Sequence, residues 1–473
     1  MRRTWFKKYS VVVVAVAAAL AVGGIVWSRQ REARRLDEAL AALDGEDPDW
    51  RVDGVVKRHN AAVPTDDAAN STKLSLAAHA MQPPSGGSRL AAITTAHEIP
   101  GMTWDNERLP RDEEFCSLYE VHLDSAEAHR VALAAAKLPR GGLPLHFGDP
   151  DPNTIPTFHW FAARKLSALL DDYATVEAYF GRGDEALRAV SATLHYAQTA
   201  LATEPTFHSQ RVRLGCATTA AHGAQRTLAW TEPSRELADL QAAFAASAAV
   251  DGVTLVFRGE RAVILRIYEN VRSGDLPATH LDSYLGGPPR AAQVTRYQRR
   301  LGGNSTVRDQ AEVLRASSAF VAAARLSGPA RRAACDDIEA GLSPGLTQFF
   351  RYARAAVEHD DVGRARLLCA SVGLACERYR RQFGRWPATL AEVPASILPA
   401  LPPDPLTGEA FAYQVLSDGA IVYSVSKVAH VRPGSTDEDV SILGWEVAAK
   451  FRLWNPESRR RPPRPDPTPE DEP

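Results

Sequence analysis

A long apolar run without a single charge near the N-terminus constrains the fold of this chain more than any other feature. The run begins at Ser10, ends at Trp27 and is about 18 residues long, close to the length at which an α-helix crosses a bilayer. Basic residues flank it on both sides: Arg2, Arg3, Lys7 and Lys8 before it, and Arg29, Arg31, Arg34 and Arg35 after it. The sequence therefore predicts a short basic tail and a transmembrane helix in residues 1–28, with the lipid bilayer as partner of this segment.

A cleaved signal peptide is the alternative interpretation of this run. Ala19, Leu20 and Ala21 imitate the A-x-A pattern of a cleavage site, but apolar sequence continues beyond them, so an uncleaved anchor is the stronger prediction. The flanking basic residues are equal in number on the two sides and do not decide the orientation. A short tail before a long body is typical of a signal anchor. We therefore expect a single-pass protein of the cell (inner) membrane with its body outside the cytoplasm.

Composition excludes several classes of protein. The chain has 473 residues, of which 45% are hydrophobic and 24% charged, and its net charge is −2. Because such a chain has no basic field, no nucleic-acid partner is predicted. The five cysteines are odd in number and form no C-x-x-C pair, so neither a disulfide scaffold nor a zinc module is expected.

Residues 29–45 have the spacing of an amphipathic juxtamembrane helix. Apolar residues recur there at helical intervals, namely Ala33, Leu36, Leu40 and Leu43. Gly45 is expected to end the helix. Two interpretations remain open at this point: a coiled-coil neck or partner helix, and a solvated extension of the anchor.

Residues 46–157 are predicted to be rich in loops, with one helix at 125–138 that Ser125 caps. His122, Glu127 and His129 are the residues in this region that invite a metal-site interpretation. Their spacing does not place all three on one face of a helix, so surface or capping roles are expected instead.

Residues 158–363 are predicted to form an α-helical body of stacked hairpins. Breaks at Gly181 to Gly183 and at Glu204-Pro205 separate the first three helices. The expected helices are 158–180, 184–203, 206–230, 234–249, 259–273, 306–326, 330–341 and 344–358. The first hairpin weakly resembles tetratricopeptide-like packing, although no strict repeat period is present.

No catalytic residue is predicted. The residues 341–345 fit the G-x-S-x-G pattern of a nucleophile elbow, but the residue after Ser343 is Pro344, which has no N–H for an oxyanion hole. Ser343 as N-cap and Pro344 as first helical residue is the better interpretation. The acidic pairs Asp171-Asp172, Asp336-Asp337 and Asp360-Asp361 are expected on solvated helix surfaces, because neighbours on a helix point apart. No cofactor is predicted.

A small α+β module is predicted at residues 364–447. A helix over 364–383 ends at Gly384, and a proline-rich connector follows. Alternating residues then predict an antiparallel hairpin with strands near 411–415 and 421–425 and a turn at 417–419. Residues 440–447 are expected to add a third strand.

This block carries a family resemblance. The residues Tyr379, Gly384-Arg385-Trp386-Pro387, Leu401-Pro402-x-Asp404-Pro405, Tyr413, Gly419 and Tyr423-Ser424 resemble the C-terminal half of type II secretion major (G-type) pseudopilins. The chain looks more like uncharacterised planctomycete-type single-pass membrane proteins, which carry this block after a helical body. Glu204-Pro205-Thr206 also matches the pattern of those proteins. It departs from pseudopilins because the prepilin-peptidase pattern is missing and the body separates the anchor from the block.

The pseudopilin resemblance also implies calcium in the loop after the final hairpin. Asp437, Glu438 and Asp439 are the only acidic residues near that loop, and they are weak calcium candidates because 427–435 supplies no acidic ligand. An exposed acidic turn is the alternative. Residues 448–473, which include Arg459-Arg460-Arg461, are of low complexity and are expected to form a disordered tail.

The sequence as a whole predicts a mainly α protein: an N-terminal transmembrane helix, a hairpin-stacked body and a small C-terminal α+β module. We expect a structural or protein-interaction role at the envelope, with a protein partner. An envelope hydrolase with an unrecognised site and a pseudopilin-related secretion component are the alternatives.

Overall fold

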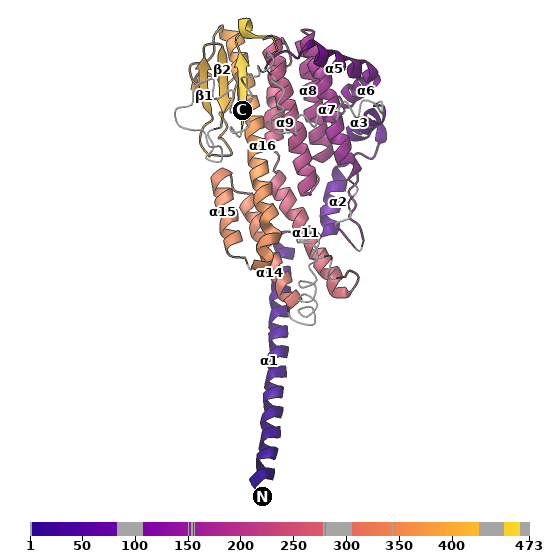
Figure 1. The fold of residues 1–473 in the computed structure, drawn as a ribbon, viewed down its shortest axis with the longest axis vertical. Coiled ribbons are helices and arrows are strands. Elements are labelled where there is room, and N and C mark those ends of the chain that lie inside the picture. Colours follow the sequence, from indigo (N-terminus) through magenta and orange to yellow (C-terminus); the bar gives the residue numbers. More distant parts are fainter. Residues whose placement is uncertain are drawn as a thin grey trace, which may run out of the picture.

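The computed structural model describes residues 2–82, 107–149, 157–277, 305–342, 344–424 and 449–463, with a few isolated positions besides. Across these residues the chain is mainly helical, and a three-stranded sheet lies near the C-terminal end (Figure 1). The mainly α fold and the small antiparallel module are therefore confirmed. The long first helix projects from one end of the body.

The projecting element is α1 (Arg2–Glu46), one continuous helix that joins the apolar run to the body. Its last turns pack on α14 (Ser305–Ala324), where Leu36 and Leu43 are 2% and 4% exposed. Both side chains belong to a hydrophobic cluster shared with α11, α14 and α16. The end predicted near Gly45 is confirmed. Neither open interpretation of this segment was right, since its apolar stripe packs against the chain's own body.

Residues 46–157 contain four described helices, so the prediction of a loop-rich region with one helix was wrong. They are α2 (Val52–Ala62), α3 (Ser71–Ala80), α5 (Asp112–Asp124) and α6 (Ala126–Ala135). These helices are short, and α3 buries hydroxyl side chains at positions where a buried helix usually has apolar ones. The apolar periodicity that predicts a helix is therefore weak here. Asn70 caps α3 by accepting hydrogen bonds from Thr72 N and Lys73 N, and it is fully buried.

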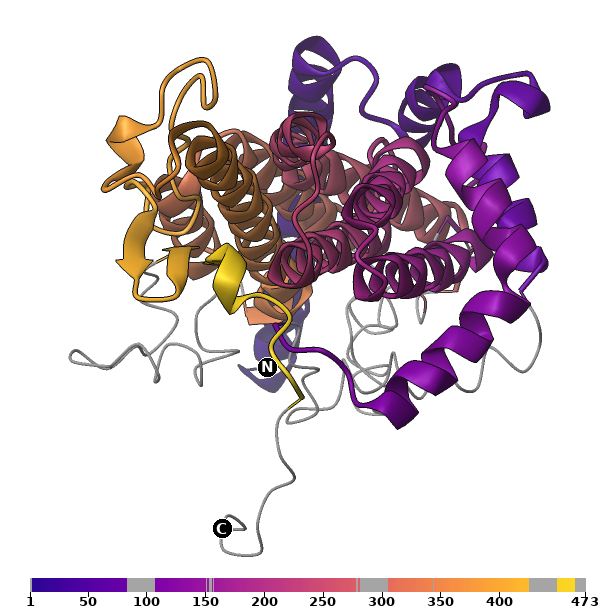
Figure 2. The same ribbon diagram turned by 90° about the horizontal axis from the view of Figure 1, so that it is seen from above.

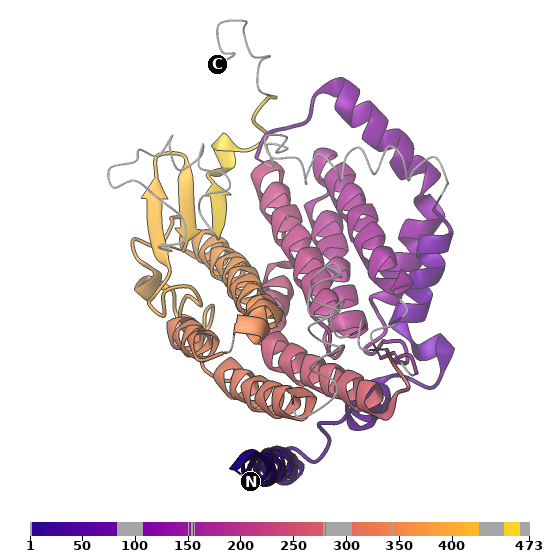
Figure 3. The same cartoon turned by 60° about the horizontal axis from the view of Figure 1, so that its bottom comes forward.

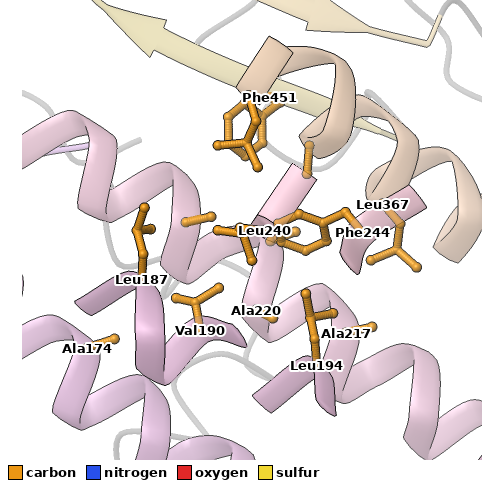
Figure 4. Packing of buried hydrophobic residues seen from close by; sticks show 14 of the residues in the cluster. Ala174, Leu187, Val190, Leu194, Ala217, Ala220, Leu240, Phe244, Leu367 and Phe451 are labelled. Carbon is orange, nitrogen blue, oxygen red and sulfur yellow. The ribbon is translucent and has the colours of Figure 1, made fainter. Parts of the chain in front are cut away.

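The core bundle begins with three antiparallel helices: α7 (Phe158–Tyr179), α8 (Gly183–Leu201) and α9 (Phe207–Trp230). Their breaks are where the sequence predicts them. Gly181 has a φ of 79°, a backbone conformation that favours glycine, and the Thr206 hydroxyl accepts from Ser209 N to cap α9. Two further helices, α10 (Leu237–Ala248) and α11 (Gly252–Ser273), continue the body. Alanines and leucines of α7 to α10 interdigitate with residues of the C-terminal part (Figure 4).

The helix α16 (Pro344–Phe383) spans the predicted boundary between body and C-terminal module. The sequence predicts two helices here, separated at 359–363, but the structure has a single helix of 40 residues. Gly363 lies within this helix where it packs closely on α9: a Cβ there would lie 2.8 Å from a Leu214 methyl carbon. Since α16 packs on α9 and α10 as well as on the sheet, the module is continuous with the body. α15 (Gly328–Ala340) lies beside its first half.

The sheet has the order β1-β2-β3, with both pairs antiparallel. β1 (Ala412–Leu416) and β2 (Gly419–Tyr423) form the predicted hairpin, which closes with Leu416 opposite Gly419. β3 (Lys450–Trp454) lies in the stretch expected to be disordered. The third strand expected at 440–447 is outside the described residues. Seen from above, the sheet and the α3–α5–α6 group lie on opposite flanks of the bundle (Figure 2), and Figure 3 shows the same arrangement.

The triple arginine after β3 docks on the body, which corrects the prediction of a disordered tail up to residue 463. Arg459 donates to Thr231 O at 2.6 Å and to the Glu377 carboxylate at 2.9 Å. Arg460 N donates to Ala229 O, and the Arg461 guanidinium lies 3.4 Å from the centroid of the Trp454 ring. These arginines were assigned to the tail because the sequence does not show which buried groups they meet.

Two helical glycines give a matched test of the packing between α11 and the α8–α9 turn. A Cβ on Gly259 would lie 1.7 Å from Pro205 O, whereas a Cβ on Gly215 meets nothing within 4 Å. We expect Gly259→Ala to destabilise the protein by about 3 kcal/mol, since backbone must move. Gly215→Ala should be neutral or stabilising by up to about 1 kcal/mol. Urea unfolding of the two variants measures the difference, and equal midpoints would contradict the close approach.

Candidate functional site

The predicted metal candidates divide into three groups. His122 and His129 come together, with ring centroids 5.1 Å apart, between α5, α6 and α7. Glu127 lies away from them on the exposed face of α6, where it pairs with Arg130. Asp437, Glu438 and Asp439 lie outside the described residues. Within the described ranges no group of three His, Cys, Asp or Glu side chains is placed to hold a metal ion.

The two histidines form a buried aromatic contact with Tyr173 of α7, whose ring lies 5.4 Å from that of His122 and 5.0 Å from that of His129. Neither ring nitrogen of His129 has a hydrogen-bond partner, and its side chain is 2% exposed. Burial, together with the neighbouring His122, lowers the pKa of His129 to about 3. Burial also lowers the pKa of His122. This pair is therefore neutral packing at neutral pH.

The lowered pKa of His129 predicts acid sensitivity. A histidine in the unfolded chain titrates near pH 6.5, so between about pH 6.5 and 3 the unfolded state binds a proton that the folded state does not. Stability is therefore complete above pH 6.5 and falls as the pH drops through that window. By pH 5 the loss is roughly 2 kcal/mol. In His129→Leu the free energy of unfolding should fall less between pH 7 and pH 5, by about that amount. Urea unfolding at the two pH values measures the difference. The exposed His146→Leu is the control, and identical slopes for all three proteins would contradict the assignment.

The buried pair that most resembles a catalytic dyad is His159 with Glu204. His159 Nε2 lies 2.7 Å from Glu204 Oε1, and the other carboxylate oxygen accepts from Trp160 Nε1 at 2.9 Å. His159 Nδ1 is buried, so a substrate does not reach the nitrogen that a general base would use. The three side chains instead fix the α8–α9 turn to α7. Glu204-Pro205-Thr206, noted in the sequence as a pattern, is thus a packing junction.

One of the three acidic pairs, Asp360-Asp361, is buried, and so is Asp172 of another pair, which corrects their prediction as solvated surface. Asp360 and Asp361 of α16 are 3% and 0% exposed and face Arg331 of α15, which is 1% exposed. Arg331 Nη2 donates to Asp360 Oδ2 at 3.1 Å and also to Asp361, and Arg332 Nη1 donates to Asp361 Oδ2 at 2.6 Å. Burial raises the pKa of Asp360 despite these arginines. Burial alone would lower the pKa of Arg331, but the two carboxylates outweigh it and raise that pKa.

The same arginines connect the body to the C-terminal module. Arg332 also donates to the carbonyl oxygens of Pro405 and Leu406. Asp404 is 1% exposed and accepts from Leu406 N, Thr407 Oγ1 and Ser424 Oγ. In the pair Asp171-Asp172, Asp171 binds Arg226. Burial raises the pKa of the adjacent Asp172 well above its usual range. These groups stabilise the fold through buried ion pairs and hydrogen bonds.

A small hollow between α15 and α16 has a volume of about 30 Å³, enough for very few water molecules. It is lined by Arg332, Cys335, Asp336, Arg354, Val357 and Glu358.

The G-x-S-x-G motif lies between two helices. α15 ends at Ala340 and α16 begins at Pro344, as the capping interpretation of the motif expects; Ser343 is outside the described residues. All five cysteines are free, and all but Cys116 are buried.

The first half of α1 is the feature that remains without a protein partner in the described part of the chain. Its described apolar side chains are exposed to between 47% and 72%: Val13, Val16, Leu20, Val22, Val26 and Trp27. They line a helix that extends away from the body (Figure 1). Soluble proteins expose single apolar residues, but a continuous exposed apolar helix of this length marks an interaction surface.

A second helical stretch has the composition of a membrane span. In the residues searched, Leu237–Ser273 is the one stretch long and apolar enough to cross a membrane, with a mean hydropathy of 1.5, and half of its apolar window is buried in the protein. It comprises α10 and α11, whose side chains belong to the two main hydrophobic clusters. Core helices pass such a test. Several side chains between Ser10 and Trp27 lie outside the described residues, so the N-terminal anchor stays a prediction.

Comparisons with known proteins do not place the chain in a family. No family model matches it, no curated protein matches it, and no solved structure matches it. The resemblances drawn from the C-terminal block therefore stay predictions, and the functional argument rests on the exposed part of α1 and on the body to which it is joined.

Proposed function

We propose that this chain is a single-pass membrane protein whose helical body performs a structural or protein-interaction role at the bacterial envelope. One observation carries the proposal: the apolar half of α1 projects from the body with its described apolar side chains exposed. In water such a helix would be unfavourable by roughly 25 cal/mol for each Å² of apolar surface. A bilayer removes that surface from water without any change in the helix.

The way α1 joins the body supports an anchor that positions the body. The helix continues without a break from Trp27 to the buried Leu36, a rise of about 14 Å. Trp50 follows in the same hydrophobic cluster, and its indole N–H donates to Asp44 at 2.8 Å. Arg258 and Arg261 of α11 also bind Asp47, just after the helix. An anchor held in this way fixes the orientation of the body relative to the membrane, whereas a flexible linker would not.

An interaction role suits the rest of the body better than catalysis. In the described residues the buried titratable groups pair with each other or pack against apolar side chains, as the His159–Glu204 pair and the Arg331 network do. The hollow beside α15 is too small for a substrate. We therefore assign the body a scaffold or binding role with a protein partner, and we retain the placement of the body outside the cytoplasm from the signal-anchor pattern of the sequence.

Extraction of membranes from cells that produce the full chain tests the anchor. We expect the protein to remain in the pellet after washing with alkaline carbonate, and added protease to degrade the body in spheroplasts but not in intact cells. Recovery in the carbonate supernatant would overturn the anchor. Complete protection in spheroplasts would overturn the orientation and leave the anchor in place.

Co-purification tests the role of the body. From membranes dissolved in mild detergent, the full chain should carry a stoichiometric protein partner. A chain that runs alone at its own mass, with the fold intact by circular dichroism, would contradict the interaction role.

A further inference from the structure

Between the exposed apolar half of α1 and its buried end lies a short basic stripe. Arg31, Arg34 and Arg35 are all exposed, and their spacing of three and four residues places them on one face of the helix. With about 1.5 Å of rise per residue, they lie roughly 6 to 12 Å beyond Trp27. We call these three residues the arginine collar.

The collar faces away from the body. Leu36, Leu40 and Leu43, which pack against α14 and its neighbours, lie on roughly the opposite side of α1 at 100° per residue. The contacts that the structure gives the collar are within α1: Arg35 pairs with Glu32 at 3.0 Å, and the Arg31 guanidinium lies 5.4 Å from the centroid of the Trp27 ring. The described part of the body therefore does not use this face.

The height of the collar matches the headgroup layer. If Trp27 lies at the interface, as tryptophans beside membrane spans do, the next 6 to 12 Å of helix pass through the layer of phosphates, which is roughly 5 to 8 Å thick on each side. Only one carboxylate, Glu32, stands among the three guanidinium groups. A guanidinium binds a phosphate with two parallel hydrogen bonds, so the collar complements a phosphate surface in both charge and geometry.

We infer that the arginine collar binds the headgroups of anionic phospholipids in the leaflet beside the body. This inference rests on the proposed membrane anchor and adds a lipid preference to that anchor. Anionic lipids are expected to gather around α1. Because salt screens the three guanidinium groups and Glu32 partly offsets their charge, they predict a preference of roughly tenfold over a zwitterionic lipid, which is about 1.4 kcal/mol in all.

The test uses the full chain reconstituted in phosphatidylcholine vesicles that contain about 20 mol% phosphatidylglycerol, so that both lipids are in excess. Spin-labelled forms of each lipid report by electron paramagnetic resonance how much of each is held at the protein surface. The unchanged protein should hold phosphatidylglycerol roughly tenfold more than phosphatidylcholine, and high salt should weaken the preference. The variant Arg31→Gln, Arg34→Gln, Arg35→Gln should enter the vesicles and show a clearly weaker preference, with the remainder coming from Arg29 and from the basic residues before the apolar run.

The control variant Arg130→Gln, Arg188→Gln, Arg354→Gln removes three exposed arginines of the body and should keep the preference. Equal binding of the two lipids by the unchanged protein overturns the inference while leaving the anchor intact. A preference that is undiminished in the collar variant also overturns it. Failure of the unchanged protein to enter vesicles, seen by flotation, overturns the anchor and the collar together.

Discussion

Arg331→Met should lower the free energy of unfolding by about 3 to 5 kcal/mol, because it leaves two buried carboxylates without their shared cation. Arg331, Asp360 and Asp361 are each at most 3% exposed, so water does not replace the lost hydrogen bonds. Breaking such a pair from one side is far more costly than removing both partners. On a protein whose total stability is of the order of 10 kcal/mol, this loss is readily seen in urea unfolding.

Two further variants separate the buried charge from a general effect of losing an arginine. Arg354→Met removes an exposed arginine that pairs with Glu358 four residues on, and should cost less than about 0.5 kcal/mol. The combination of Arg331→Met with Asp360→Asn and Asp361→Asn should recover part of the loss, since no buried carboxylate is left without its cation; Arg332 loses Asp361 but is partly exposed to water. If the single variant and the exposed control have the same unfolding midpoint, the buried network does not stabilise the fold.

The second large effect concerns the membrane anchor. Arginine at the centre of a membrane helix costs about 2.5 to 3.5 kcal/mol in insertion. Val16 and Leu20 lie near the middle of the apolar run and are 53% and 72% exposed, so their replacement disturbs no contact with the body. We expect Val16→Arg with Leu20→Arg to move most of the protein from the carbonate-resistant pellet to the supernatant.

The matched control places the same two charges where α1 is already solvent-exposed beside the body. Ala33→Arg with Ala42→Arg should leave the protein in the pellet, because both positions lie beyond Trp27 on the body side. Circular dichroism of each variant checks that the body stays helical. A double variant at 16 and 20 that stays fully in the pellet would show that another segment holds the protein on the membrane.

The extent to which the sequence predicts this fold depends on how local the determinants are. The helices α7, α8 and α9 were predicted because Gly181 and the Thr206 cap mark their ends within the segment itself. The β1–β2 hairpin was predicted for the same reason, from alternation around a turn that closes at Gly419. Signals of this kind lie within a few residues of the feature they specify.

The features that were missed depend on partners far away in the chain. Asp361 looks like surface until Arg331 of α15 is placed against it, 30 residues earlier in the sequence. Arg459 looks like part of a disordered tail until Glu377 and Thr231 receive it. Sequence periodicity contains no signal for such long-range polar contacts. The pairing of His122 with His129 was missed for another reason: α5 and α6 bend at Ser125 and bring together two nearby rings that a single straight helix would separate.

The central claim is that the exposed half of α1 lies in the bilayer and continues into the body as one helix. Its most direct test is a depth profile along α1 in vesicles, made with single cysteines at Val13, Leu20, Trp27, Arg34 and Ala42 in a Cys116→Ser background. Each cysteine carries a fluorophore, and quenchers are placed in the acyl chains or in water. The account predicts the deepest position at Leu20, an intermediate depth at Val13, an interfacial depth at Trp27, and full access from water at Ala42. A profile in which Leu20 is quenched from water as strongly as Ala42 would contradict it.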